Sequence, residues 1–279
     1  MRTGTATRRG YRGPLRAVVL DWAGTMIDFG SMAPARAFVR AFEAHGVVVS
    51  VEEARGPMGV DKRTHIARMG AEPAIAARWM ATHRGAAMTS EDIDQVHAKF
   101  VALEMSLVRE HAALVPGARE LANALRARGL KIGTTSGYSR EIMDVVAELA
   151  RAQGYAPDAS ICAGETPSGR PGPLQCYEAL VALDVWPVAG CIKVDDTLAG
   201  IDEGLNAGMW TVAVAVTGNE VGMTREAWEG LGAMAQRALR QRAYDRLLAA
   251  GAHYVIDSVA ELPSCIEAIE ARLRRGETP

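Results

Sequence analysis

The stretch Val18-Val19-Leu20-Asp21-Trp22-Ala23-Gly24-Thr25 decides the fold of this chain. An apolar run of strand length ends at an aspartate, and the glycine that follows lets the backbone turn sharply and bring its amides close to a phosphoryl group. A carboxylate in this position is a candidate nucleophile toward phosphorus. The alternative is that Asp21 only caps the following turn, as isolated aspartates often do. The motifs described below favour the nucleophile.

Ala23 occupies the position two residues after Asp21. An aspartate there would serve as general acid for an alcohol leaving group. Its absence predicts a leaving group other than a simple alkoxide.

The composition is that of an ordinary soluble globular protein. The 279 residues are 49% hydrophobic and 23% charged, which is enough for two domains and a sizeable core. The net charge of -2 gives no reason to expect a nucleic acid or an anionic membrane as partner, and no run approaches the roughly 20 apolar residues that span a bilayer. Residues 1–14, rich in arginine, are predicted to be a disordered basic leader. The four cysteines form no CxxC pair, so we expect reduced core residues in a cytoplasmic protein.

Apolar runs of strand length alternate with amphipathic helical stretches, which is typical of a parallel sheet covered on both faces. The strands are predicted at residues 17–21, 131–135, 159–163, 191–194, 210–215 and 253–256. The helices between them are predicted at residues 117–127, 139–153, 174–183 and 198–207. The pattern predicts an α/β core, a doubly wound, Rossmann-like parallel sheet made of residues 15–32 and 109–279.

Residues 33–108 break this alternation and are predicted to form an inserted α-helical cap domain. Helical periodicity is found at residues 35–45, 52–55, 62–69, 74–84 and 91–111. Such an insert would stand over the carboxyl ends of the strands, where open α/β sheets bind ligands, and could close on substrate. A later segment, residues 223–248, is expected to form surface helices.

Polar residues follow two further predicted strands. Ser136-Gly137 places a hydroxyl and free amides at the start of a helix, where they suit an anionic oxygen, although Ser136 could also be only an N-cap. Asp195-Asp196-Thr197 brings two more carboxylates to the same edge of the sheet as Asp21. Carboxylates this close need a cation to offset their repulsion, and the oxygen-rich set suits Mg²⁺.

Two cationic residues are candidates for substrate binding or catalysis at this edge of the sheet. Arg170, in Gly169-Arg170-Pro171, has a guanidinium group that can donate two hydrogen bonds at once to a phosphoryl or phosphonyl group. The alternative is a solvated surface arginine. Lys62 lies at the start of a predicted cap helix, with His65 one turn later on the same face. A lysine can form a Schiff base with a carbonyl substrate if its amine is kept neutral, by a nearby cation such as Arg63 or by a dry interface. The alternative is a solvated surface lysine.

Together, Asp21 to Thr25, Ser136, Arg170 and Asp195-Asp196 resemble the motifs of the haloacid dehalogenase superfamily, with a helical cap between the first two motifs. Within it, the chain is similar to the phosphonoacetaldehyde hydrolases from about Leu15 to the C-terminus. The segments that carry this similarity are Asp21 to Thr25, Pro57-Met58-Gly59 with Lys62 and His65, Thr135-Ser136-Gly137-Tyr138, Gly169-Arg170-Pro171, and Asn206-Ala207-Gly208-Met209-Trp210-Thr211-Val212.

The resemblance implies a magnesium-dependent hydrolase that cleaves the carbon–phosphorus bond of phosphonoacetaldehyde to acetaldehyde and phosphate, working as a homodimer through its cap domains. A carbanion is a very poor leaving group, and an iminium on Lys62 would accept its electrons so that the product leaves as an enamine. Asp21 would form an aspartyl-phosphate that water then hydrolyses.

The resemblance also implies a set of metal ligands. Mg²⁺ is expected on Asp21, Asp196 and the carbonyl of Ala23. Other family members can carry Gly-Asp-Thr followed by a further Asp, whereas this chain has Asp195-Asp196-Thr197 and then Gly200. Asp195 is therefore an alternative ligand.

Five other positions match family residues around the substrate. Arg170 is expected to bind the oxyanions together with Ser136 and Gly137. Met58 would shield the iminium and His65 would shuttle protons, although both are also plausible packing residues.

Three other functions stand against this one. A phosphate-ester phosphatase or sugar-phosphate mutase on the same fold needs the general acid that Ala23 cannot provide. A dehalogenase attacks carbon without metal and has no use for the paired Asp195-Asp196. A catalytically dead binding module is disfavoured by the full set of reactive residues.

Overall fold

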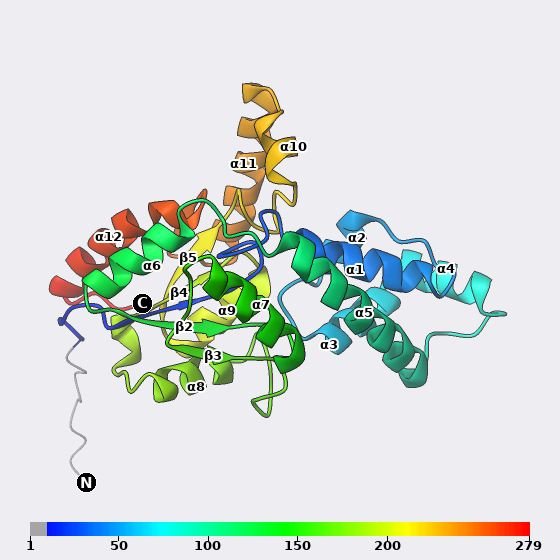
Figure 1. Cartoon of the computed structure of the whole chain (residues 1–279), viewed down its shortest axis with the longest axis horizontal. Helices are drawn as coiled ribbons and strands as arrows, with labels where there is room; N and C mark the ends of the chain where they lie inside the picture. The colour runs from blue at the N-terminus through cyan, green and yellow to red at the C-terminus, as the bar shows by residue number, and fades with distance from the viewer. Residues whose placement is uncertain (1–9) are drawn as a thin grey trace, which may run out of the picture.

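The computed structural model describes residues 10–279, and its centre is a six-stranded parallel sheet (Figure 1). The strands run in the order β3-β2-β1-β4-β5-β6. Their bounds are β1 Ala17–Leu20, β2 Lys131–Thr135, β3 Ala159–Ile161, β4 Cys191–Asp195, β5 Trp210–Val214 and β6 Tyr254–Ile256. This is the strand order of a doubly wound fold, so the expected fold class is confirmed.

Helices cover both faces of the sheet. Successive side chains of each buried strand point to opposite faces, so both faces are apolar and both need to be covered. On β1, Val18 and Leu20 pack in one cluster with α6 Ala118–Ala127, α7 Arg140–Ala152 and α12 Leu262–Arg274. Ala17 and Val19 face the opposite side, against α8 Leu174–Ala182. The helix α9 Leu198–Ala207 contacts β4 and β5. With both faces covered, β1 is entirely buried and can be apolar throughout.

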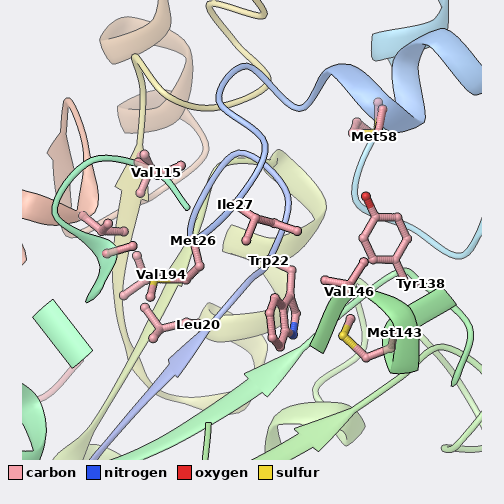
Figure 2. Packing of buried hydrophobic residues seen from close by; sticks show 14 of the residues in the cluster. Leu20, Trp22, Met26, Ile27, Met58, Val115, Tyr138, Met143, Val146 and Val194 are labelled. Carbon is pink, nitrogen blue, oxygen red and sulfur yellow. The ribbon is translucent and has the colours of Figure 1, made fainter. Parts of the chain in front are cut away.

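The strand order reverses between β1 and β4, which pair directly with each other. In open α/β sheets, ligands bind at this switch point, outside the carboxyl ends of the strands. Figure 2 shows the packing around the end of β1, where Leu20, Trp22 and Val194 lie in one buried apolar cluster. A rigid apolar base therefore holds the loop that follows β1.

A helical segment, inserted between β1 and α6, lies to one side of the sheet (Figure 1). It comprises α1 Met32–Glu43, α2 Val51–Arg55, α3 Lys62–Ala71, α4 Pro73–Thr82 and α5 Ser90–His111. Capping boxes begin α2, at Ser50, and α5, at Thr89. The rings of Phe38 on α1 and Phe100 on α5 stack with centroids 4.2 Å apart. Both rings belong to the same buried cluster as Val18 and Leu20 of the sheet. The helices of the segment lie within a few residues of the expected ones.

The remaining segments differ from expectation in detail. The segment expected at residues 223–248 forms α10 Arg225–Glu229 and α11 Ala233–Ala249, which project from the sheet in Figure 1. The helix α12 was not foreseen. Residues 1–9 of the expected leader lie outside the described residues, but Tyr11 packs against the core and donates a hydrogen bond to the Pro14 carbonyl oxygen at 2.6 Å.

All four cysteines are free thiols and buried, as expected of core residues; they are Cys162, Cys176, Cys191 and Cys265. Between residues 10 and 279, the structure has no helix long and apolar enough to cross a membrane.

Candidate active site

Asp21 lies directly after β1, at the switch point of the sheet, and is nearly buried. Its amide donates to the Val194 carbonyl oxygen at 2.9 Å, so the strand pairing continues to the reactive residue. Burial raises the pKa of the Asp21 carboxyl to about 6, and the neighbouring Asp195 adds to the rise. Arg170 opposes it through an ion pair of 2.9 Å between Nη2 and Oδ1. The position fits a nucleophile and not a solvated turn cap.

Three carboxylates converge at this edge, those of Asp21, Asp195 and Asp196. They offer oxygens that all lie within 4.8 Å of one another. Asp196 accepts hydrogen bonds from the Asn219 amide at 2.8 Å and from Thr25 Oγ1 at 3.2 Å. Burial, followed by the charges of Asp21 and Asp195, raises its pKa well above the usual range. Hard oxygen donors under mutual repulsion fit a divalent cation.

Gly24 is what lets the turn after β1 approach Asp196 so closely. Its backbone has φ +81°, in the left-handed region that favours glycine. A Cβ at this position would lie 2.2 Å from Oδ2 of Asp196. Any other residue would therefore displace one of the three carboxylates.

Arg170 is buried among carboxylates and is not a solvated surface residue. Besides Asp21, it pairs with Asp195 at 3.3 Å and with Glu203 at 2.9 Å. Its Nη2 also donates to the carbonyl oxygen of Thr135 at 2.7 Å. The guanidinium is thus fixed in one orientation against the candidate nucleophile.

Lys193 and Glu203 complete a buried network that sequence reasoning missed. Lys193 Nζ lies 3.0 Å from both Asp195 and Glu203, and it donates to Thr135 Oγ1 at 2.6 Å. A signal was available, because a lysine in the middle of a buried strand is rare unless it is paired. Its partner on α9 could not be read from the sequence.

The charges of this network do not cancel. The four carboxylates of Asp21, Asp195, Asp196 and Glu203 stand against the two cations Arg170 and Lys193, which leaves two negative charges when all are ionised. Burial opposes ionisation of Asp195, but Arg170 and Lys193 hold its pKa below the usual range. The surplus negative charge falls on the pair Asp21 and Asp196. The donor set and the charge both fit one divalent cation.

Ser136 and Gly137 follow β2 at the same edge, and both line a cavity with Asp21. Ser136 Oγ accepts a hydrogen bond from the Tyr138 amide at 3.0 Å, whereas the N-cap of α7 is Ser139. Gly137 allows close contact with the helical segment, since a Cβ there would lie 2.8 Å from the Val60 carbonyl oxygen. The N-cap alternative for Ser136 is therefore wrong.

Lys62 enters the same cavity from the helical segment, at the first turn of α3. It is 7% exposed, which excludes a solvated surface lysine. Its Nζ lies 4.8 Å from the centroid of the Tyr138 ring, 5.6 Å from that of Phe38 and 5.8 Å from that of Phe100. Burial lowers the pKa of its amine. Arg63 points away and pairs with Asp94 at 2.6 Å, so the dry surroundings, and not Arg63, favour the neutral amine.

The other expected residues of the helical segment differ in their access to the cavity. Met58 lines it together with Ala23 and Tyr138, and Figure 2 shows Met58 near the hydroxyl end of the Tyr138 ring. His65 is fully buried behind them, stacked on Phe38 with centroids 3.7 Å apart. Its Nε2 lies 2.8 Å from the Ala54 carbonyl oxygen and must carry the proton, while Nδ1 has no hydrogen-bond partner among residues 10–279. Burial lowers the pKa of His65 well below the usual range, so the ring is neutral.

Gly59 brings this segment into contact with the sheet. Its φ is +100°, and a Cβ there would lie 2.3 Å from Thr197 Oγ1. The loop before α3 therefore rests on the loop after β4, which sets Lys62 over Asp21. Neither Gly59 nor Tyr138 was assigned a role from the sequence.

Comparison with known proteins identifies the family of this chain. The family model of haloacid dehalogenase-like hydrolases matches residues 15–208. The phosphonoacetaldehyde hydrolase of Paraburkholderia phytofirmans is 48% identical over 265 residues, which cover 95% of this chain and 99% of that protein. The phosphonoacetaldehyde hydrolase of Hahella chejuensis is 45% identical, over 98% of this chain and 93% of that protein.

Solved structures extend the agreement to the whole fold. The crystal structure of a phosphonoacetaldehyde hydrolase-like protein from Oleispira antarctica superposes with a TM-score of 0.95 at 44% identity, covering 100% of both chains. A putative β-phosphoglucomutase from Bacteroides vulgatus, with a TM-score of 0.66 at 19% identity, shares the fold alone. The chain belongs to the haloacid dehalogenase-like hydrolases and, within them, to the phosphonoacetaldehyde hydrolase family.

Proposed function

We propose that this protein hydrolyses the carbon–phosphorus bond of phosphonoacetaldehyde, releasing acetaldehyde and phosphate. One observation carries the proposal: a buried lysine from the helical segment and a buried aspartate from the sheet line the same cavity. Lys62 is suited to the aldehyde end of the substrate, and Asp21 to the phosphorus end. The relatives named as phosphonoacetaldehyde hydrolases support the same substrate.

Lys62 activates the leaving group. Its neutral amine adds to the aldehyde carbon, water is lost, and the resulting iminium accepts the electrons of the breaking carbon–phosphorus bond. Lys62 then carries an enamine, which is protonated at carbon and hydrolysed to acetaldehyde. The ring of Tyr138 and the side chain of Met58 shield this intermediate from water, because both line the cavity beside Nζ. His65 is suited to exchange a proton only through Nδ1.

Asp21 accepts the phosphoryl group as an aspartyl-phosphate, which water then hydrolyses. Arg170 orients the Asp21 carboxylate and, with Ser136 and the Gly137 amide, binds the phosphonate oxygens. Ala23 supplies no acid, and the reaction needs none there, because the electrons of the leaving group pass to the iminium. A phosphate-ester phosphatase, the alternative function, would need that acid.

Mg²⁺ is the metal that these residues fit best, held by Asp21, Asp196 and the carbonyl of Ala23. It would neutralise the surplus negative charge of the site and screen the phosphoryl oxygens from the nucleophile. Asp195 is already engaged by Arg170 and Lys193, which favours Asp196 as the second carboxylate ligand.

Trapping the Schiff base tests the function. The protein is incubated with phosphonoacetaldehyde, reduced with borohydride and digested, and we expect the mass of the reduced adduct on Lys62. Lys62→Arg should lose the adduct and turnover. Lys99→Arg, an exposed lysine on α5 of the same segment, should retain both. Full turnover by Lys62→Arg, or equally fast release of phosphate from simple esters, would exclude the proposed reaction.

The proposed homodimer forms through the helical segment, which we also propose to be a separate cap domain of residues 33–108 on a core of residues 15–32 and 109–279. Val48 is 69% exposed and Met80 39% exposed on that segment. Val48→Glu should produce monomers in analytical ultracentrifugation. Met234→Glu, at an 85% exposed position on α11, should leave the dimer intact, and a monomeric wild type would refute the dimer. The four free cysteines support a cytoplasmic location.

A further inference from the structure

Glu104, on α5, is a buried carboxyl group without a hydrogen-bond partner. It is fully buried, and neither of its carboxylate oxygens has a partner within the described residues 10–279. Burying a carboxylate without hydrogen bonds is costly, and a leucine at this position would avoid the cost. We therefore expect Glu104 to make an interaction that offsets the free-energy cost of burying its carboxylate.

The cation with the largest effect on the pKa of Glu104 is Lys62. Glu104 lies one helical turn after Phe100, on the buried face of α5, and Lys62 Nζ lies 5.8 Å from the Phe100 ring. Among charged groups, Glu104 in turn has the largest effect on the pKa of Lys62, which its charge raises. Lys62 lines the cavity whereas Glu104 is not part of its lining, so the carboxyl acts on the amine from outside the cavity.

We propose that Glu104 is the buried counter-charge of Lys62, a positioning residue that sets the pH range in which Lys62 attacks the aldehyde and keeps its iminium protonated. The inference rests on the proposed Schiff-base function. In that step the ammonium group of Lys62 first loses one proton, and the free amine bonds to the aldehyde carbon. The nitrogen then loses a second proton, and the carbonyl oxygen leaves as water with these two protons. The positive charge stays on nitrogen, in surroundings of aromatic rings that solvate it poorly. A nearby carboxylate lowers the cost of that charge.

Other charges also face this pair, and Glu104 is the one among them that belongs to no other assigned role. The groups that act on Lys62 besides Glu104 are Asp21, Arg170 and Asp61, and Asp28 also acts on Glu104. Asp61 caps α3 by accepting from the Thr64 amide at 2.9 Å. Asp28 accepts from the amides of Met32 and Ala33 at the start of α1. Glu104 alone has no such partner in residues 10–279.

The sign of the effect follows from the charge. A negative group near nitrogen favours its protonated form, whether amine or iminium, so removing Glu104 should lower the pKa of both. The acidic limb of the reaction, where the amine must be free, and the alkaline limb, where the iminium must stay protonated, should then both move to lower pH. A loss of packing alone would reduce the rate without moving either limb.

The test measures how fast Lys62 is alkylated by acetaldehyde and cyanoborohydride across the neutral pH range, with the modified peptide quantified by mass spectrometry. We expect Glu104→Gln and Glu104→Leu to shift the midpoint by about one unit to lower pH, and the pH profile of turnover to shift likewise. Two variants are used because the leucine fills the site without a polar group. Glu110→Gln, at an exposed position on the same helix, should not shift it.

The outcomes separate this inference from the function on which it rests. A wild-type adduct on Lys62 with unchanged midpoints in both Glu104 variants would overturn the counter-charge and leave the proposed function intact. The absence of any wild-type adduct would overturn both.

Discussion

The carboxylate of Asp195 fills the space into which a side chain at Gly200 would project. A Cβ at position 200 would lie 1.9 Å from Cγ of Asp195 and 2.0 Å from its Oδ2. Asp195 in turn holds Lys193 at 3.0 Å and accepts a hydrogen bond from the Thr197 amide at 3.0 Å. The two positions are therefore coupled: a carboxylate at 195 requires glycine at 200.

Gly200→Ala should displace Asp195 and disturb Arg170 and Lys193 with it. Because breaking a buried ion pair is strongly destabilising, we expect a loss of roughly 3 kcal/mol in the free energy of unfolding, together with most of the activity. Chemical denaturation and turnover assays measure the two effects. Gly232→Ala, where a Cβ would meet nothing within 4 Å, is the control. Wild-type stability in Gly200→Ala would show that the site relaxes easily.

The exchange Asp195→Gly with Gly200→Asp tests whether the carboxylate can be supplied from the other position. A side chain at 200 starts where the Asp195 carboxyl now lies, so its carboxylate should reach the same cations. We expect the double variant to be more active and more stable than either single variant, a non-additivity measured by a double-mutant cycle. Additive losses would contradict the coupling.

Glu203 should act on catalysis through Arg170. Its Oε2 lies 2.9 Å from Arg170 Nε and accepts from Thr135 Oγ1 at 2.9 Å. Glu203→Gln removes the negative charge that pairs with Arg170 Nε, so the guanidinium should be held less firmly and should orient Asp21 less well. We expect kcat to fall roughly tenfold or more with a smaller change in KM, measured by steady-state kinetics. Glu178→Gln, exposed on α8, should behave as the wild type; an equal effect there would point to global destabilisation.

The sequence could predict the sheet side of this site because several of its residues follow strands. Asp21, Ser136 and Asp196 each come just after an apolar run, and the ends of parallel strands meet at one edge of a sheet. Lys193 and Glu203 meet across a strand and a helix, a contact that depends on how α9 packs. Their pairing therefore required the structure.

Helix geometry explains two further differences between the sequence-based predictions and the structure. Arg63 follows Lys62 directly and so lies about 100° around α3, where it pairs with Asp94 in solvent. Glu104 interrupts an apolar stripe on α5 that includes Val96, Phe100 and Leu107. That interruption was visible in the sequence as a charge on the buried face of a helix, but the lysine opposite it was not.

Mg²⁺ should stabilise the folded protein through Asp196. Saturating Mg²⁺, at about 100 times its Kd, should add about 2.7 kcal/mol and raise Tm by roughly 5 °C relative to protein treated with a chelator. Asp196→Asn should lose this rise, and without metal it should be at least as stable as the wild type, because it removes a buried charge repelled by Asp21. Asp202→Asn, exposed on α9, should keep the full rise; the same rise in Asp196→Asn would exclude Asp196 as a ligand.

The buried carboxyl of Glu104 should make stability depend on pH in a defined direction. Burial raises its pKa to about 7 in the folded protein, from 4.5. Between these values the folded state binds more protons than the unfolded state, so the contribution of Glu104 to stability falls as pH rises through this window. Glu104→Gln lacks this titration. Relative to the wild type, the variant should therefore gain stability as pH rises from below 4.5 to above 7, by about 3.4 kcal/mol at most.

Urea denaturation of both proteins at several pH values measures this difference. The cost of burying the glutamine amide is the same at every pH, so it shifts the whole curve and leaves the slope unchanged. Glu110→Gln should follow the wild type throughout, because Glu110 is exposed. A difference between Glu104→Gln and wild type that stays constant with pH would mean that Glu104 titrates alike in both states, and hence that its carboxyl finds solvent or a partner in the folded protein.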